Sequence, residues 1–273
     1  MTKTYAHDGF EFRVNEDGVL VSMVNKTGER RDVVISRNPT SDCTIRSIGG
    51  NFCNGIYKNV YISSSIEEVQ AFAFINSDID HVHWSNNHKT IPQFCFDGSS
   101  IGKITGIEHV TKIEDSAFAN SCIAHIDWPV NCTEIPRRCF YNSELLTIVG
   151  TGNVTKIGVQ AFYNSLINSL TNVSKVKEIG EKAFACSDIA DFKWPSMCKI
   201  IPKECFCESK LACITNIDDI DTIGKLAFAG TKNLKGIDLS NSMVSSIGKK
   251  AFSGMDPDNI TLPYYFSAEY ALV

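Results

Sequence analysis

Hydrophobic residues recur along most of the chain with a fixed spacing. Nine phenylalanines are separated by seven successive intervals of 22 residues and a last interval of 24. The residue before each of them is Ala or Cys, and other apolar residues precede them at constant offsets. This regularity indicates an internal repeat that is too short for a pair of helices. The phenylalanines are Phe74, Phe96, Phe118, Phe140, Phe162, Phe184, Phe206, Phe228 and Phe252.

Each repeat opens with the pattern apolar-x-x-apolar-x-apolar, which is typical of the strand of a leucine-rich repeat. We expect one short parallel strand, then a turn, then a return segment that ends at Ala/Cys-Phe and forms a single helical turn. One unit cannot bury its own apolar edge, so neighbouring units must stack into a solenoid. Nine copies start at Tyr57, Ile79, Ile101, Ile123, Leu145, Ile167, Ile189, Leu211 and Leu234, the last with one extra residue.

The two ends of the repeat array need caps. Residues 1–56 are predicted to form an N-terminal β-rich cap with a degenerate first repeat, and residues 57–255 form the nine repeats. Asp17-Gly18 predicts a hairpin turn between alternating apolar runs at 10–14 and 19–23. Residues 256–273 are predicted to form a partial repeat and a C-terminal cap, in which Tyr264, Tyr265, Phe266 and Tyr270 close the core.

Three tryptophans occupy the third core position of their strands, Trp84, Trp128 and Trp194. Neighbouring repeats carry smaller residues there, and a stacked core requires large side chains beside small ones. We therefore predict that the indole rings are buried. The same alignment places Asn172 inside, which argues against its glycosylation sequon, and makes His88 a buried residue with satisfied hydrogen bonds.

Composition narrows the class of partner. The chain has 273 residues, a formal charge of -5, and 26 basic against 31 acidic residues. This balance argues against nucleic acid, which requires a surplus of Lys and Arg on one face. No apolar run approaches the roughly 18 to 20 residues of a membrane span. Residues 1–12 show no secretory signal pattern.

Several repeats resemble a known family. Ile-Gly-x-x-Ala-Phe occurs at 157–162, 179–184, 223–228 and 247–252, and Ile-Thr-Leu-Pro follows at 260–263. These units are similar to the BspA-like leucine-rich repeats of bacterial and parasitic-protist surface antigens. The resemblance implies a right-handed parallel solenoid for protein recognition, with some members acting as adhesins. It also implies a cell-surface or secreted location, whereas the absence of a visible signal leaves a cytoplasmic location as the alternative.

The outward strand positions form the candidate binding surface. Repeat proteins bind through the concave face on which such positions lie, and large polar or aromatic groups gather there in the N-terminal half. A solvated sheet face with no binding role would show the same residues. In the C-terminal half these positions hold mostly small side chains. The candidate ligand-binding residues are Tyr61, His81, His83, Lys103, His125 and Asp127.

No enzymatic or cofactor pattern is recognised. His81 and His125 are two repeats apart, roughly 9.6 Å, which is too far for shared metal coordination. No nucleophile with a base and an orienting acid is visible, and no phosphate-binding loop occurs. We expect no catalytic residue, no metal and no cofactor.

Most of the eleven cysteines are expected to be buried small hydrophobes. This applies to Cys95, Cys139 and Cys205 before phenylalanines, and to Cys132 and Cys198 in tryptophan repeats. Two minor alternatives remain. One is zinc bound by Cys205 and Cys207, or by Cys207 and Cys213, and the other is a disulfide between Cys186 and Cys207.

The sequence predicts a non-enzymatic solenoid that binds a protein or glycan through its concave face, as a surface antigen or adhesin. An intracellular scaffold or regulator of a protein partner is the alternative.

Overall fold

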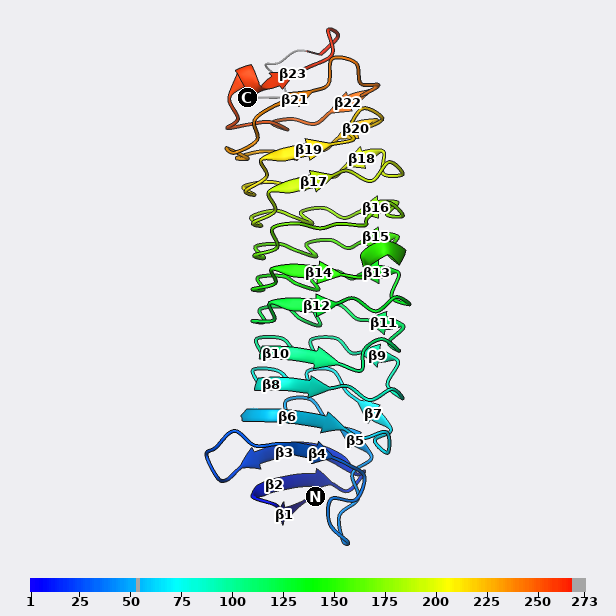
Figure 1. Cartoon of the computed structure of the whole chain (residues 1–273), viewed down its shortest axis with the longest axis vertical. Coiled ribbons are helices and arrows are strands. Elements are labelled where there is room, and N and C mark those ends of the chain that lie inside the picture. The colour runs from blue at the N-terminus through cyan, green and yellow to red at the C-terminus, as the bar shows by residue number, and fades with distance from the viewer. Residues whose placement is uncertain (53–54, 267–273) are drawn as a thin grey trace. The chain divides into compact units, whose positions relative to one another are not determined.

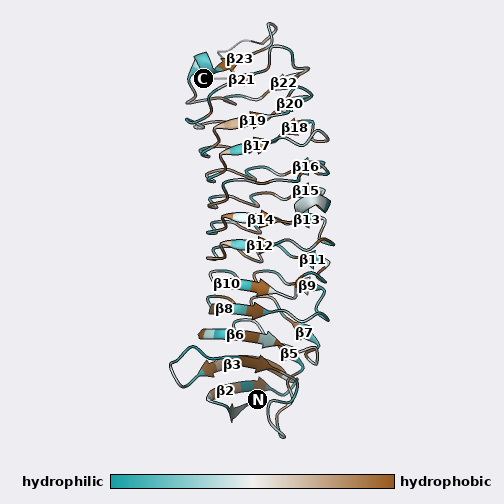
Figure 2. Ribbon diagram, viewed as in Figure 1, coloured by the Kyte–Doolittle hydropathy of each residue, from teal (hydrophilic) through white to brown (hydrophobic). Residues whose placement is uncertain are grey.

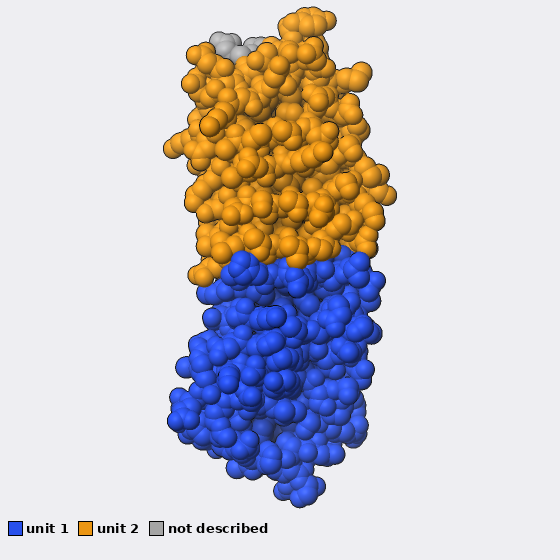
Figure 3. All heavy atoms as spheres, in the orientation of Figure 1, with its two compact units in different colours: residues 1–132 blue, residues 133–273 orange. Residues whose placement is uncertain are grey.

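The computed structural model describes residues 1–52 and 55–266. The chain divides into two units, residues 1–132 (unit 1) and 133–273 (unit 2), which Figure 3 distinguishes by colour. Each unit is a parallel β-solenoid built from the 22-residue repeats, with short strands stacked in register (Figure 1). The predicted leucine-rich-repeat fold is confirmed.

Unit 1 begins with three antiparallel strands, β1 (Thr2–His7), β2 (Phe10–Asn15) and β3 (Val19–Asn25). Gly18 makes the turn between β2 and β3 with φ +80°, a conformation that glycine adopts without strain. The register shifts at Arg13/Val14. Simple alternation predicts that Val19, Val21 and Met23 of β3 are buried. Because the bulge changes the alternation, the buried residues are Leu20 and Met23.

The repeats of unit 1 place one set of strands in a four-stranded parallel sheet, in the order β10-β8-β6-β4. A second set of two-residue strands forms the return side of each repeat. The main strands are β4 (Val33–Ile35), β6 (Ile56–Ile62), β8 (Asp78–His83), β10 (Ser100–Thr105) and β12 (His125–Asp127), and the return strands are β5 (Ser47–Ile48), β7 (Glu68–Val69), β9 (Thr90–Ile91) and β11 (Lys112–Ile113).

Unit 2 continues the same pattern with shorter strands. Its sheets are β13-β15-β16, β17-β19, β18-β20-β22 and β21-β23, and the last strand starts at Ile260 as the sequence predicts. The strands are β13 (Glu134–Ile135), β14 (Thr147–Val149), β15 (Lys156–Ile157), β16 (Glu178–Ile179), β17 (Asp191–Lys193), β18 (Ile200–Ile201), β19 (Cys213–Thr215), β20 (Thr222–Ile223), β21 (Ile237–Asp238), β22 (Ser246–Ile247) and β23 (Ile260–Thr261).

The return segment ends in a tight turn and not in a helical turn. Residues two before and two after the repeat phenylalanine adopt left-handed backbone angles, for example Gln160 (φ 57°) and Asn164 (φ 51°) around Phe162. Left-handed residues cannot continue an α-helix. Helix in the described residues is confined to two short 3-10 segments, η1 (Thr151–Asn153) and η2 (Pro257–Asn259).

The repeat phenylalanines stack through the core of each unit. Phe74 and Phe96 lie 5.3 Å apart in unit 1, and Phe162 and Phe184 lie 5.5 Å apart in unit 2, with nearly parallel rings. The Ala or Cys before each ring is also fully buried, since a larger side chain would occupy the space of the neighbouring repeat. Hydrophobic and hydrophilic segments alternate along both units as this packing requires (Figure 2).

All three tryptophans are buried, as predicted. The predicted reason, that each indole ring packs beside smaller core residues of the neighbouring repeats, does not hold at every repeat. Their indole Nε1 atoms donate to carbonyls four residues later, for example Trp194 to Cys198 at 2.8 Å. The small residues beside them do not face the core: Asn172 and Asn216 adopt left-handed angles and are exposed. In these repeats the following residue, such as Val173, is buried instead. The placement of Asn172 inside the core was therefore wrong.

Two further expectations require correction. Tyr264 is 98% exposed and Tyr265 is more than half exposed, so these rings do not close the core. Tyr265 instead donates its hydroxyl hydrogen toward the carbonyls of Ser242 and Val244. Tyr270 lies outside the described residues. His88 is buried as predicted, but neither ring nitrogen has a hydrogen-bond partner among the described residues.

Candidate recognition face

The candidate site lies on the outer face of the sheet β4-β6-β8-β10 in unit 1. Tyr61 on β6, His83 on β8 and Thr105 on β10 are register partners. Asn59, His81 and Lys103 form a second row on the same strands. Core residues alternate with these positions, because successive side chains of a strand point to opposite faces. Repetition therefore brings residues 22 apart side by side.

Tyr61, His81, His83 and Thr105 form one contact cluster, which we call the histidine cluster. The ring of Tyr61 stacks on His83 with centroids 4.1 Å apart and planes 7° apart. His81 lies 3.8 Å from His83. The Thr105 hydroxyl is 2.9 Å from Nε2 of His81 and 3.3 Å from Nδ1 of His83. These contacts hold all three rings in fixed orientations.

The histidine cluster favours neutral imidazoles. Burial lowers the pKa of His81, and the charges of His83 and Lys103 lower it further. Burial also lowers the pKa of His83, where Lys103 adds to the effect and Asp32 opposes it. Nε2 of His83 is buried without a hydrogen-bond partner among the described residues, so a proton there would be poorly solvated. Both shifts favour the uncharged imidazole at neutral pH.

The six predicted site residues separate into two groups. Tyr61, His81 and His83 are in direct contact, and Lys103 acts on both histidines through its charge. His125 and Asp127 lie on β12 and are exposed. Thr105 was missed as a site residue, although its outward offset is the same as that of Tyr61 and His83.

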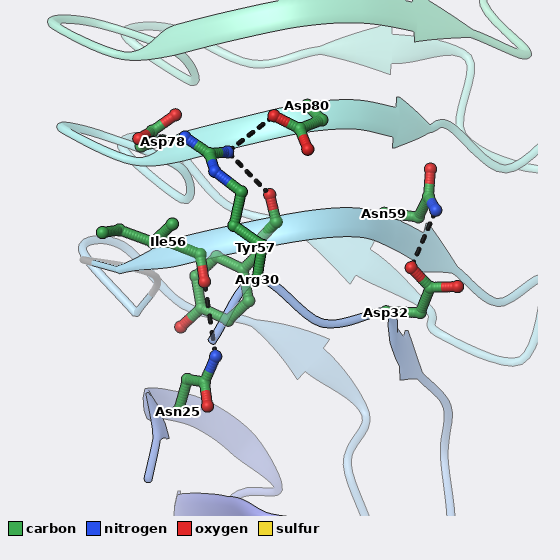
Figure 4. A network of polar contacts seen from close by, with 8 residues as sticks. All are labelled: Asn25, Arg30, Asp32, Ile56, Tyr57, Asn59, Asp78 and Asp80. Atoms are coloured by element: carbon green, nitrogen blue, oxygen red, sulfur yellow. Dashed lines mark hydrogen bonds and ion pairs between the residues drawn. The ribbon is translucent and has the colours of Figure 1, made fainter. Parts of the chain in front are cut away.

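An ion-pair network next to the cluster was also missed. Arg30 donates to Asp78 and to Asp80 over 2.6 Å each, and to the carbonyl of Tyr57 over 3.3 Å (Figure 4). The hydrogen bond with Asp78 is the main cause that raises the pKa of Arg30. Because Arg30 belongs to the irregular N-terminal segment, no repeat offset could align it with aspartates 48 and 50 residues later.

A second link joins the same segment to β6. Nδ2 of Asn59 donates to Asp32 over 2.8 Å (Figure 4). Asn59 is the register partner of His81, and the charge of Asp32 raises the pKa of His83. The N-terminal segment thus supplies charged groups along one border of the histidine cluster.

None of the ten described cysteines forms a disulfide. Cys95, Cys139 and Cys205 are fully buried, and burial raises the pKa of Cys132 to about 12 and of Cys198 to about 11. Within the described residues no group of three or more His, Cys, Asp or Glu side chains is arranged to hold a metal ion.

The two cysteines considered for a disulfide lie in adjacent repeats. The amide of Cys186 donates to the carbonyl of Cys207 over 2.8 Å, and both side chains are half-buried and unbonded to each other. A hydrogen bond to Cys186 is the main cause that raises the pKa of Tyr163 to about 12.

Comparison with known proteins identifies the family. The sequence profile of the BspA type leucine rich repeat region matches residues 38–147, 111–235 and 199–268, with six copies of the unit. The chain therefore belongs to this family of leucine-rich-repeat proteins. A search of the curated proteins finds no match to the chain. No helix among the described residues is long and apolar enough to cross a membrane.

Solved structures align with most of the chain at low sequence identity. Pneumococcal vaccine antigen PcpA is 14% identical with a TM-score of 0.50, over 96% of this chain and 82% of that one. A leucine rich cell surface protein from Faecalibacterium prausnitzii is 18% identical with a TM-score of 0.49, over 98% and 96%. The T. pallidum leucine rich repeat protein is 18% identical with a TM-score of 0.40, over 85% and 91%. Family and fold together define a protein-interaction repeat protein.

Proposed function

We propose that this protein is a non-enzymatic recognition protein that binds a protein ligand through the histidine cluster of unit 1. The supporting observation is the stack of Tyr61 on His83, tied to His81 and Thr105. Aromatic side chains dominate the energy of protein interfaces. Rings already held in one orientation lose little conformational entropy on binding. Lys103 and the exposed His125 and Asp127 of β12 supply a polar surround.

Replacing single rings of the cluster tests this function. We expect Tyr61→Ala and His83→Ala each to weaken binding at least tenfold on an array of extracellular-matrix and host-cell proteins. The melting temperature should change by only a few degrees, because neither side chain belongs to the core. Tyr264→Ala and His109→Ala remove an exposed tyrosine and an exposed histidine elsewhere and should not alter binding. Equal binding by the cluster variants and these controls would contradict the proposal.

The pH profile provides a second readout of the same site. The pKa of both imidazoles is lowered from 6.5, the ordinary value for histidine, so any change that their protonation causes has its midpoint below pH 6.5. Binding should therefore change little between pH 7 and 8, and any change should have its midpoint below pH 6.5. A change centred above pH 7 would exclude these histidines as the titrating groups.

We further propose that the protein acts as a surface antigen or adhesin, and this rests on its membership of the BspA type family. Antibody staining of intact source cells, with permeabilised cells as the control, tests the location. Signal on intact cells is the expected result. Signal only after permeabilisation would contradict the adhesin proposal and would favour an intracellular protein partner.

A further inference from the structure

The outer surface of unit 2 contains a hollow over strands β17 and β19. Its volume is about 630 Å³, within the range of roughly 300–1,000 Å³ that is usual for small-ligand sites. Segments of three consecutive repeats line it. The side chains that matter for the argument are Thr171, Asn172, Asp191, Lys193, Cys213 and Thr215.

The large apolar side chains that lie beneath the hollow are buried. Leu170, Phe192 and Trp194 contribute to the lining, yet their side chains point into the core and are at most 4% exposed. The energetic anchors of protein interfaces are aromatic or other large side chains that fill pockets. The aromatic side chains of the lining, Phe192 and Trp194, are therefore not exposed as anchors for a peptide ligand.

The charges in the hollow cancel. Asp191 and Lys193 lie two residues apart on β17, so they point to the same face. Neither side chain makes an ion pair or a hydrogen bond within the described part of the chain, and both are exposed. One carboxylate and one ammonium group disfavour a polyanion such as nucleic acid. They suit a ligand that both donates and accepts hydrogen bonds.

The remaining polar groups are short hydroxyls and amides. Thr171 and Thr215 occupy outward positions on the two repeats that flank the repeat of Lys193. Asn172 and Asn216 place their side chains at the surface because their backbones are left-handed. Nδ2 of Asn216 donates to the carbonyl of Trp194 over 2.7 Å, which fixes that amide. Such groups supply closely spaced donors and acceptors with little conformational freedom to lose.

We propose that this hollow binds a short neutral oligosaccharide. The Asp191 carboxylate accepts hydrogen bonds from adjacent sugar hydroxyls, and the Lys193 ammonium donates to a hydroxyl or ring oxygen. The threonine methyl groups and the exposed backbone contact the apolar C–H faces of the sugar rings. The site lies wholly within unit 2 and shares no residue with the histidine cluster, so it extends the proposed function without depending on it.

An array of neutral oligosaccharides, probed with the full chain, tests the proposal. We expect selective retention of a subset of sugars, with at least tenfold weaker binding by Asp191→Ala and by Lys193→Ala. Both variants should keep the wild-type melting temperature, since both side chains are exposed. Asp218→Ala and Lys232→Ala remove matched exposed charges outside the hollow and should bind normally. No retained sugar, or equal retention by all four variants, would overturn the proposal.

The exposed thiol of Cys213 gives an independent readout. A bound sugar should slow its alkylation by iodoacetamide, whereas the exposed thiol of Cys122 in unit 1 should react at an unchanged rate. Protection of Cys213 by peptides but not by neutral sugars would overturn the assigned ligand class. Protein binding that depends on Tyr61 should persist in Asp191→Ala, which separates failure of this site from failure of the proposed function.

Discussion

His88 occupies a repeat position that holds an aliphatic residue or cysteine in other repeats, such as Ile66 and Val110. Its ring is buried beside Trp84, with centroids 6.0 Å apart. Burial lowers the pKa of His88. The nearby backbone of Ile66 raises the pKa and so offsets part of this shift, but the contact does not have the geometry of an ordinary hydrogen bond. An imidazole whose two nitrogens are both unsatisfied reduces stability, because it has lost its bonds to water.

We therefore expect His88→Val to stabilise the protein by about 1 kcal/mol at pH 7. The gain should grow as the pH falls below about 6.5, because the unfolded wild-type chain then binds a proton that the folded state resists. Urea unfolding at pH 5 and pH 7 measures both effects. His109→Val, at an exposed histidine, should change neither value. A destabilised H88V would mean that His88 makes a favourable contact that outweighs its unsatisfied nitrogens.

At the scale of the element, each main strand ends in one of two ways. In one type the residue after the last outward position is apolar and buried, as are Ile62, Leu239 and the three tryptophans. In the other type this residue is Gly or Asn with a left-handed backbone, as at Gly106 (φ 79°) and Asn216 (φ 65°). A Cβ at Gly106 would lie 2.0 Å from the carbonyl oxygen of Trp84. At Gly106 the small residue is thus required by the neighbouring backbone and not by the volume of the indole ring.

Gly106→Ala should consequently destabilise the protein by at least about 2 kcal/mol, since it adds left-handed strain to a backbone clash. The matched control is Gly152→Ala, because nothing lies within 4 Å of a Cβ at that position. Thermal and urea unfolding of both variants give the comparison. Similar stabilities for the two would show that the strand end at Gly106 is not constrained as described.

The strand positions could be predicted from sequence, whereas the turns could not. Inward positions such as Val60 and Val82 follow directly from the repeat offsets and are fully buried. The left-handed residue two before each phenylalanine is Phe, Ser, Arg, Gln, Lys, Glu or Leu. No residue preference marks that conformation, because hydrogen bonds to the adjacent repeat impose it; the amide of Gln160, for example, donates to the carbonyl of Glu181.

At the scale of the molecule, stability is expected to be a sum of contacts between neighbouring repeats. Each tight turn donates to the next repeat, as Phe74 does to Cys95 and Phe162 to Ala183, both over 2.8 Å. Contacts between residues that are more than one repeat apart in the sequence are concentrated at the N-terminal segment, where Arg30 contacts Asp78 and Asp80. Each unit is therefore held by many small and similar interactions.

This packing predicts a pattern of thiol reactivity. In the native protein Cys122 and Cys213 should be alkylated first, and the half-buried Cys186 and Cys207 more slowly. Six described cysteines should react only after unfolding, because they are buried and a raised pKa holds several of them as thiols. Peptide mass spectrometry after timed alkylation measures each site. Early modification of any of the six would contradict the core as described; they are Cys43, Cys95, Cys132, Cys139, Cys198 and Cys205.

The sequence by itself determined the repeat, the family resemblance and the inward-facing set, because a 22-residue period leaves only one alignment of the apolar positions. It also placed Tyr61, His81 and His83 on one face. Only the tertiary structure decided that Thr105 ties these rings together and that Arg30 borders them. It alone showed that Asn172 and Asn216 turn outward and help to enclose a hollow. These features depend on backbone angles and side-chain contacts between repeats, and a one-dimensional pattern does not contain that information.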